Sequence, residues 1–447
     1  MNMIIKDQNV SKGSSHLKKQ TEGFSIQNYM ISNMQYNAAY VNHILKNNLK
    51  DNDKKILDDF KQRYSDYRNK WLSLGKTNLK NEELTKENTQ NPLCVDIETA
   101  SICDLACPHC YREYIITPDK IMDEKLYKKI IDQIVKMKVP SIKLNWRGEP
   151  LMNPKITEFI KYAKKQGILE VSINSNATHL NKKMAQKILD AGLDILIFSF
   201  DGGTRSTYEK MRPGRFKENK FEEVLENIKN FSLLKKEKNK IFPLTKIQMV
   251  LTKSTREEVE PFFKLFKDYI DDVTVTQYQE RGGNLSDLQD KQKEKIQTYK
   301  KSLSHKYENF QYIAKVDGSI LVSTKRLPCE QLHQRMMVTF DGKVGMCCHD
   351  WGAKHCIGYL DKKAFNDNPL KDVEKKINQN KKGFELLSKA KMPKNYNNPD
   401  KKVSELKEIW SGEELNKVRE LHSMNKVNDV EICKGCTFKN SYEWEKI

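Results

Sequence analysis

Three cysteines, Cys103, Cys107 and Cys110, stand in one short segment, with three residues between the first two and two residues between the last two. Thiolates at such spacing in a loop can ligate a four-iron cluster, which takes four ligands. Three thiolates leave one iron without a protein ligand, and that iron can bind a substrate or a cofactor. The alternative is a zinc site completed by His109 or a distant cysteine, because zinc also binds Cys and His at short spacing.

A second group of cysteines lies in the C-terminal part of the chain. Two fully ligated four-iron clusters would need eight thiolates, and even one open iron would need seven, so six thiols favour a single additional cluster. A zinc knuckle on four of them is the alternative. We expect the tenth cysteine, Cys94, to be a small buried apolar residue of a strand. The six are Cys329, Cys347, Cys348, Cys356, Cys433 and Cys436.

The composition restricts the kind of partner. Lys and Arg outnumber Asp and Glu by 79 to 60 in 447 residues, a net charge of +19, but 67 of these cations are Lys and only 12 are Arg. Nucleic-acid readers favour Arg, so we interpret the charge as a solvated Lys surface and do not expect a nucleic-acid partner. No apolar run approaches the roughly 18 residues of a membrane-spanning helix, and Met1 to Gln20 lacks a signal-peptide core. We therefore expect a cytoplasmic protein without a membrane partner, whose cysteines ligate metal rather than form disulfides.

The first cysteine group follows a short apolar run that opens an alternation of strand and helix patterns. Six units of this kind predict an α/β fold with a parallel sheet curled into a barrel or part of one, in which ligands bind at the carboxyl ends of the strands. The predicted strands are 93–97, 141–145, 170–174, 194–199, 246–251 and 273–276, and the helices named between them are 125–137, 155–165, 182–191 and 221–234.

Three domains are predicted. Residues 1–90 form a polar, mainly helical N-terminal extension with an amphipathic stretch from about Lys54 to Leu74. Residues 91–285 form the barrel, and residues 286–447 form a small α+β domain that holds the second cysteine group. We expect a hairpin around residues 338–344 of this domain and a Lys/Asn-rich surface insertion at about 371–402.

The spacing Cys103-x3-Cys107-x2-Cys110 after the first predicted strand resembles the defining signature of the radical S-adenosylmethionine (SAM) superfamily. This resemblance covers residues 93 to about 280 as a partial (βα)6 barrel. It implies that SAM chelates the open iron of a 4Fe-4S cluster through its amino and carboxylate groups. One electron from the cluster then cleaves SAM to a 5′-deoxyadenosyl radical that abstracts hydrogen from a substrate. A flavodoxin- or ferredoxin-type electron donor is implied as well.

Segments after the later strands resemble SAM-binding elements of the same family. The segment after the second strand resembles the family's Gly-Gly-Glu-Pro, with Arg147 in place of the first glycine. Polar residues that end the third and fourth strands suit ribose and carboxylate contacts, and Arg212 either pairs with the SAM carboxylate or belongs to a surface loop. Glu98 either orients the cluster loop or contacts substrate. The implied cofactor-binding residues are Gly148, Glu149, Pro150, Asn174, Asn176, Ser199, Asp201 and Arg212.

The C-terminal cysteines, together with the predicted hairpin and Ile409-Trp410, resemble the SPASM/Twitch extension of this superfamily. The single-cluster Twitch form fits best. The implied ligands of an auxiliary 4Fe-4S cluster are Cys329, Cys347, Cys433 and Cys436, and Cys348 is the rival of Cys347.

These resemblances predict a radical SAM enzyme that acts on a small polar substrate of the sugar or aminocyclitol type. Hydrogen abstraction is followed by oxidation through the auxiliary cluster or by epimerisation, and the catalytic base or hydrogen donor stays unassigned. A peptide-modifying maturase competes with this prediction, although residues 1–90 offer no clear strand pair for a peptide-binding winged-helix domain. An RNA-modifying radical SAM enzyme and a non-enzymatic zinc scaffold are the two remaining hypotheses.

Overall fold

The fold is described from a computed structural model of the chain. The residues it describes are 62–64, 66–71, 90–110, 112, 118–278, 290–302, 311–314, 319–350, 353, 355–365, 402–434, 436, 438 and 441–447.

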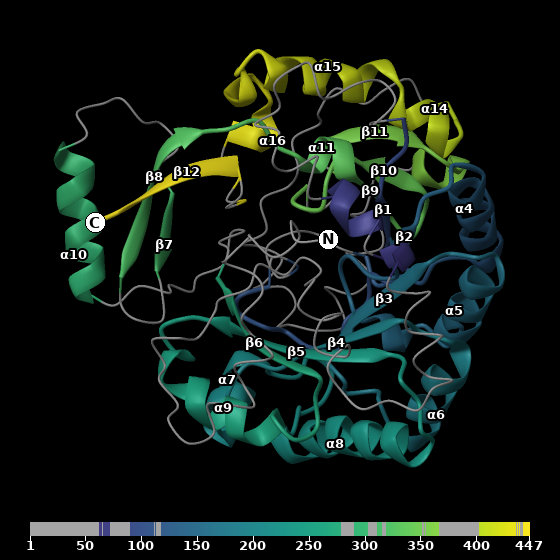
Figure 1. Ribbon diagram of the computed structural model, residues 1–447, viewed down its shortest axis with the longest axis vertical. Helices are drawn as coiled ribbons and strands as arrows, with labels where there is room; N and C mark the ends of the chain where they lie inside the picture. Colours follow the sequence, from purple (N-terminus) through teal and green to yellow (C-terminus); the bar gives the residue numbers. More distant parts are fainter. Residues whose placement is uncertain are drawn as a thin grey trace, which may run out of the picture.

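Six consecutive strands form the parallel part of the main sheet, each hydrogen-bonded to the next in chain order. The sheet curls without closing, with helices on its outer side (Figure 1). This architecture confirms the predicted α/β partial barrel. The strands are β1 (Cys94–Ile97), β2 (Ser141–Lys143), β3 (Glu170–Ser175), β4 (Ile195–Ser199), β5 (Leu244–Leu251) and β6 (Asp272–Gln277).

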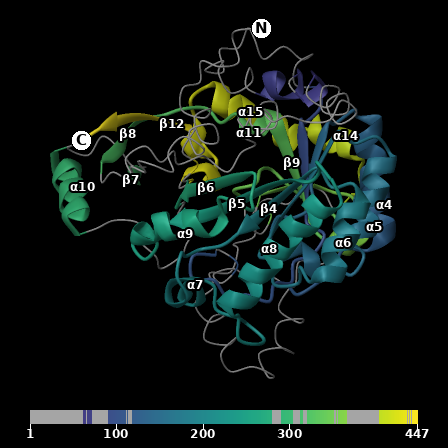
Figure 2. The same ribbon diagram turned by 60° about the horizontal axis from the view of Figure 1, so that its bottom comes forward.

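The helices between these strands are amphipathic and form an arc around the outside of the barrel (Figures 1 and 2). The first of them shows why helices form here: Asp123 accepts hydrogen bonds from the backbone N–H groups of Lys125 and Leu126 at its start, which satisfies donors that a helix leaves open. Tyr127 then stacks on Phe159 with ring centroids 3.9 Å apart. The helices are α4 (Glu124–Lys136), α5 (Ile156–Lys165), α6 (Lys182–Ala191), α7 (Arg205–Met211), α8 (Phe221–Glu237) and α9 (Val259–Phe266).

The two faces of the barrel strands differ in polarity. Successive side chains of a strand point to opposite faces, and Val95 and Ile97 of β1 pack into the main hydrophobic core. Asp96 therefore points into the barrel, where it is in register with Lys143 of β2, and Lys143 is in register with Ser172 of β3. Polar side chains in register make the inner face of the barrel hydrophilic.

The C-terminal part of the chain extends the barrel sheet. Strand β9 (Arg335–Val338) lies parallel to β1, and β10 (Lys343–Gly345) and β11 (Cys356–Tyr359) follow as antiparallel neighbours. The hairpin expected around residues 338–344 is confirmed, because Val344 pairs with Val338. Trp410 and Cys433 belong to the same hydrophobic core as the barrel. The predicted boundaries at residues 90 and 285 stay predictions.

The remaining described elements lie at the C-terminal side. A three-stranded sheet contains β7 (Tyr312–Ala314), β8 (Ile320–Arg326) and β12 (Tyr442–Lys446). Helix α10 (Asp290–Ser302) occupies a stretch whose sequence indicates only a polar separator. Short helices surround the second cysteine group: α11 (Gln331–Gln334), α14 (Leu406–Trp410), α15 (Glu413–Ser423) and α16 (Glu431–Lys434).

The structure describes only part of two predicted segments, the N-terminal extension and the Lys/Asn-rich insertion. Of the N-terminal extension, residues 62–64 and 66–71 are helical, and Tyr67 and Trp71 pack against Leu93 and Cys94. The Lys/Asn-rich insertion at 371–402 lies outside the described residues except for Lys402. Within the described ranges, no helix combines the length and the apolarity that crossing a membrane requires.

Candidate active site

The first cysteine group lies in the loop that follows β1. Cys107 is buried, while Cys103 and Cys110 are partly exposed, and the backbone N–H of Cys110 donates to the carbonyl of Cys107 at 2.9 Å. Burial raises the pKa of the Cys107 thiol, Arg212 opposes this, and the neighbouring Cys110 and Cys103 raise it further. The loop thus brings the three thiols together, as is required if all three bind the same cluster.

Polar contacts hold this loop against the ends of neighbouring strands. Asp104 accepts hydrogen bonds from Nδ2 of Asn176 at 2.8 Å and Oγ1 of Thr178 at 2.7 Å, and His179 Nε2 lies 3.4 Å from its carboxylate. Burial raises the pKa of Asp104, but His179, Thr178 and Asn176 together bring it below its usual value. The amide of Asn176, a predicted SAM contact, therefore positions the cluster loop.

The segment after β2 packs its backbone against the same loop. Gly148 has a φ of +72°, and a Cβ at this position would stand 2.4 Å from the carbonyl oxygen of Ala100. Glu149 begins the short 3-10 helix η3 (Pro150–Met152). Its carboxylate accepts from the backbone N–H of Leu151 at 3.0 Å, from Ser175 Oγ at 2.8 Å and from the N–H of Asn176 at 2.7 Å. Burial raises the pKa of Glu149 to about 7 despite these donors.

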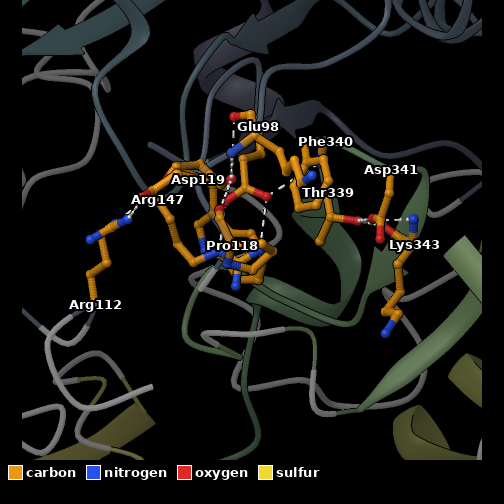
Figure 3. Close-up of polar contacts among 12 residues, drawn as sticks. Glu98, Arg112, Pro118, Asp119, Arg147, Thr339, Phe340, Asp341 and Lys343 are labelled. Atoms are coloured by element: carbon orange, nitrogen blue, oxygen red, sulfur yellow. Dashed lines mark hydrogen bonds and ion pairs between the residues drawn. The ribbon is translucent and has the colours of Figure 1, made fainter. Parts of the chain in front are cut away.

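Arg147, which replaces a family glycine, points away from that segment and pairs with Glu98. Nε of Arg147 is 2.5 Å from Oε1 of Glu98 and Nη2 is 2.8 Å from Oε2. Oε2 also accepts from the backbone N–H of Phe340 at 3.2 Å, so Glu98 stands between Arg147 and the β9–β10 turn (Figure 3). Glu98 thus ties the cluster loop to the C-terminal part of the sheet, which favours the orienting role over substrate contact.

Asp201 and Arg212, two predicted SAM contacts, pair with each other. Arg212 Nη2 lies 2.7 Å from Oδ2 of Asp201, and His109 Nε2 lies 3.2 Å from the same oxygen. Asp201 also accepts from the N–H of Val250 at 2.6 Å. Although burial raises the pKa of Asp201, Arg212 and His109 hold it far below its usual range. His109 thus belongs to this polar group, a role that the sequence did not indicate.

Several buried polar atoms at this end of the barrel have no hydrogen-bond partner among the described residues. A buried polar atom without a partner is rare in a folded protein, so their grouping indicates a ligand that supplies the partners. Ser199, a predicted contact, ends β4 beside Gln248 of β5 in the sheet. The residues of this end of the barrel fit a polar, charged cofactor such as SAM. The atoms are His109 Nδ1, Asn174 Oδ1, Arg212 Nε and Gln248 Oε1.

The second cysteine group lines a cavity with about 380 Å³ of unfilled space, open solvent included. The cavity brings together thiols from positions up to 107 residues apart. The Cys433–Cys436 pair repeats the tight turn of the first group, with the N–H of Cys436 3.2 Å from the carbonyl of Cys433. The thiols on its wall are Cys329, Cys347, Cys433 and Cys436.

Cys348 does not share the surroundings of Cys347. It packs with Trp146, Met337 and Ala353 at the barrel, and its Sγ lies 3.5 Å from Oε1 of Gln331. Cys347 instead lines the cavity together with Cys433 and Cys436. The geometry favours Cys347 over its rival. Cys356 is buried in β11, and its Sγ donates to the carbonyl of Gly358 at 3.2 Å.

Three basic side chains also line this cavity, Arg326, His349 and His422. Arg326 Nη2 lies 3.5 Å from the carbonyl of Cys433. Burial, together with the charge of Arg326, lowers the pKa of His422 to about 4, so the ring is neutral at pH 7. The sequence indicated neither Arg326 nor His422, although Arg326 stands three residues before Cys329.

The four thiols of this cavity match the ligand number of a four-iron cluster. A four-iron cluster carries its ligands on separate irons, so its thiolates need not converge on one point. Four thiols around one cavity supply the complete ligand set that such a cluster takes.

Two family models match this sequence. The one described as the radical SAM superfamily matches residues 97–266, and the one described as an iron-sulfur cluster-binding domain, SPASM, matches residues 329–437. The first range contains the cluster loop after β1, and the second contains all four thiols of the cavity.

Individual relatives match over part of their own length. A tungsten-containing aldehyde ferredoxin oxidoreductase cofactor-modifying protein from Pyrococcus furiosus is 30% identical over 24% of this chain and 30% of its own length. An AdoMet-dependent heme synthase from Methanosarcina barkeri is 29% identical over 40% of this chain and 48% of its own length. The chain thus spans less than half the length of these curated relatives. The solved structure of BtrN with AdoMet and 2-DOIA matches 78% of this chain and 94% of that one at 14% identity, with a TM-score of 0.41.

Proposed function

Because this chain belongs to the radical SAM superfamily and carries a SPASM-type iron-sulfur domain, we propose that it oxidises a small polar substrate such as a sugar or an aminocyclitol. Its cofactors are a 4Fe-4S cluster with SAM and an auxiliary iron-sulfur centre. We assign the first cluster to Cys103, Cys107 and Cys110 and the auxiliary cluster to the four thiols of the C-terminal cavity. When bound, these groups supply a 5′-deoxyadenosyl radical for hydrogen abstraction and an acceptor for one electron.

The observation that carries the proposal is the cavity walled by Cys329, Cys347, Cys433 and Cys436. Four thiolates ligate every iron of a cluster and leave no open position for SAM, so such a cluster suits electron transfer. The electrons balance: the substrate loses one hydrogen atom to the 5′-deoxyadenosyl radical, one electron to the auxiliary cluster and one proton to a base.

The inner face of the barrel supports a polar substrate. Gln248 of β5 stands in register with Ser199 of β4 and Thr274 of β6. Lys143 is partly buried on the same face, and this burial lowers its pKa. Hydroxyl, amide and amine groups of this kind can hydrogen-bond the hydroxyls of a sugar, and an apolar substrate would leave them without partners.

Anaerobic reconstitution tests the cluster assignment. The wild type is expected to hold about eight irons and eight sulfides per chain, and a variant with Ala at Cys103, Cys107 and Cys110 about four of each. Dithionite-driven formation of 5′-deoxyadenosine is expected in the wild type and absent from the variant. Zinc in place of iron, or SAM cleavage that persists without those three cysteines, contradicts the proposal.

The substrate class is tested by the rate of SAM cleavage in the reconstituted wild type. We expect deuterated monosaccharides or aminocyclitols to stimulate cleavage and to transfer deuterium into 5′-deoxyadenosine. Peptides are included as a second substrate class, and GTP is included because a similar protein from Lactiplantibacillus plantarum is named GTP 3′,8-cyclase. Deuterium transfer from a peptide or from GTP, and none from the sugars, would overturn the substrate assignment.

A further inference from the structure

The wall of the auxiliary cavity contains one histidine whose ring is held by a thiol-bearing segment. His422 belongs to α15, lines the cavity and is only 1% exposed. Its Nδ1 accepts a hydrogen bond from the backbone N–H of Cys329 at 3.1 Å. That bond fixes the orientation of the ring relative to a proposed cluster ligand.

The same bond fixes which nitrogen carries the proton. A nitrogen that accepts a hydrogen bond carries no hydrogen, so the ring of His422 has its N–H at Nε2. Nε2 has no hydrogen-bond partner among the described residues. A buried donor without a partner is costly, and therefore an acceptor is expected in the cavity that the ring faces.

Sulfur atoms of a bound cluster are the acceptors that this cavity would offer. Hydrogen bonds to the sulfurs of an iron-sulfur cluster stabilise its reduced, more negative state and so raise its reduction potential. Arg326 acts in the same direction, since its guanidinium lines the cavity and lies 3.5 Å from the carbonyl oxygen of Cys433.

We propose that His422 is a positioning residue that donates a hydrogen bond from Nε2 to a sulfur of the auxiliary cluster and thereby raises the reduction potential of that cluster. The inference rests on the proposed function, because it requires a cluster on the four thiols of the cavity. It adds to the four ligands one further side chain, His422, which raises the reduction potential and so makes the cluster an electron acceptor.

Two substitutions separate the two bonds of the ring. His422→Asn keeps an acceptor near the backbone N–H of Cys329 but is too short to place an N–H at the position of Nε2. His422→Gln reaches that position with an N–H. His333 gives a matched control, since it is buried and electrostatically coupled to His422 but is not part of the cavity wall.

The reduction potential of the auxiliary cluster is measured by EPR-monitored redox titration of the reconstituted full-length chain. The variant without Cys103, Cys107 and Cys110 identifies the auxiliary signal. We expect His422→Asn to make reduction at least tenfold less favourable, a fall of about 59 mV for a one-electron couple. We expect His422→Gln and His333→Leu to stay within twofold of the wild type.

The outcomes distinguish this inference from the proposed function. A normal iron content with an unchanged potential in His422→Asn overturns the inference and leaves the cluster assignment intact. Loss of the cluster from both His422 variants shows that the residue is needed for assembly only and also overturns it. If the wild type holds no auxiliary cluster, the proposed function and the inference both fail.

Discussion

Cys347 and Cys348 are adjacent in the turn that follows β10, but their side chains have different neighbours. Cys347 lines the C-terminal cavity with three other thiols, whereas Cys348 packs with Trp146 and Met337 at the barrel. Backbone atoms also fix this segment, since Trp146 Nε1 donates to the carbonyl of Cys348 at 3.2 Å.

This difference predicts opposite results for two neighbouring substitutions. Cys347→Ala is expected to lower the iron content of the reconstituted chain from about eight to about four, because the auxiliary cluster loses a ligand. Cys348→Ala is expected to keep about eight irons. Iron and sulfide counts on both variants provide the measurement, and a loss of iron confined to Cys348→Ala would mean that the ligand assignment is wrong.

Gly148 provides a second prediction, because the cluster loop occupies the space beside its Cα. A Cβ at Gly148 would lie 2.4 Å from the carbonyl oxygen of Ala100, at a φ of +72°. Gly167→Ala is a matched control, since Gly167 has a φ of +88° and no atom lies within 4 Å of its Cβ position. Each variant places a Cβ on a residue with a positive φ, which costs about 1–3 kcal/mol of backbone strain. Only Gly148→Ala must also displace the cluster loop.

We therefore expect Gly148→Ala to be less stable than Gly167→Ala and to lose SAM cleavage. Urea unfolding gives the stabilities, and 5′-deoxyadenosine formation after reconstitution gives the activity. Equal SAM cleavage by the two variants would show that the close approach of Gly148 to the loop has no functional consequence.

The Glu98–Arg147 ion pair predicts that the stability lost when one partner is substituted depends on whether the other partner is still present. Both side chains are at most 5% exposed, and removal of one partner of a buried pair leaves an uncompensated charge that costs about 3–5 kcal/mol. Arg147→Met is expected to lower the free energy of unfolding by that amount, and Glu98→Gln in the same chain to restore part of it. A double variant no more stable than Arg147→Met would contradict a direct pair.

Local sequence patterns predict the barrel well. The six predicted strands and the four predicted helices agree with the structure to within three residues at either end. Alternating and helical apolar patterns depend only on residues that are close together in the sequence. Helices α7, α9 and α10 are not among the four helices named from these patterns. Helix α10 has a polar sequence, DKQKEKIQTYKKS, in which apolar periodicity gives little signal.

The candidate site is less predictable, since its contacts join distant segments. Cysteine spacing alone marks the thiols. The pairing of Asp201 with Arg212 and His109, and the place of His422 beside Cys329, depend on how the strands and helices pack. Strand β9 also joins the barrel sheet beside β1, about 240 residues away in sequence, and no local pattern carries that information.

The last prediction concerns pH and a partly buried ion pair remote from both cysteine groups. Lys235 Nζ lies 2.8 Å from the carboxylate of Asp271, which also accepts from the backbone N–H and Oγ1 of Thr245, each at 2.8 Å. Burial raises the pKa of Asp271, but Lys235 and Thr245 outweigh it and the pKa falls below its usual value. A carboxyl with a lowered pKa in the folded state stabilises the fold above its unfolded pKa of about 3.9, and this contribution is lost as the pH falls.

Lys235→Met is therefore expected to destabilise the chain at pH 7 by about 1.5–3 kcal/mol, the range for hydrogen bonds to charged groups. The difference from the wild type should shrink below about pH 4, where the carboxyl is protonated in the unfolded chain. Lys236→Met is the control, because Lys236 is exposed on the same helix and its Nζ donates only to the carbonyl of Asp268 at 3.1 Å. Urea unfolding at pH 7 and pH 3.5 provides the comparison, and a difference that is the same at both pH values would show that the charge of Asp271 does not contribute.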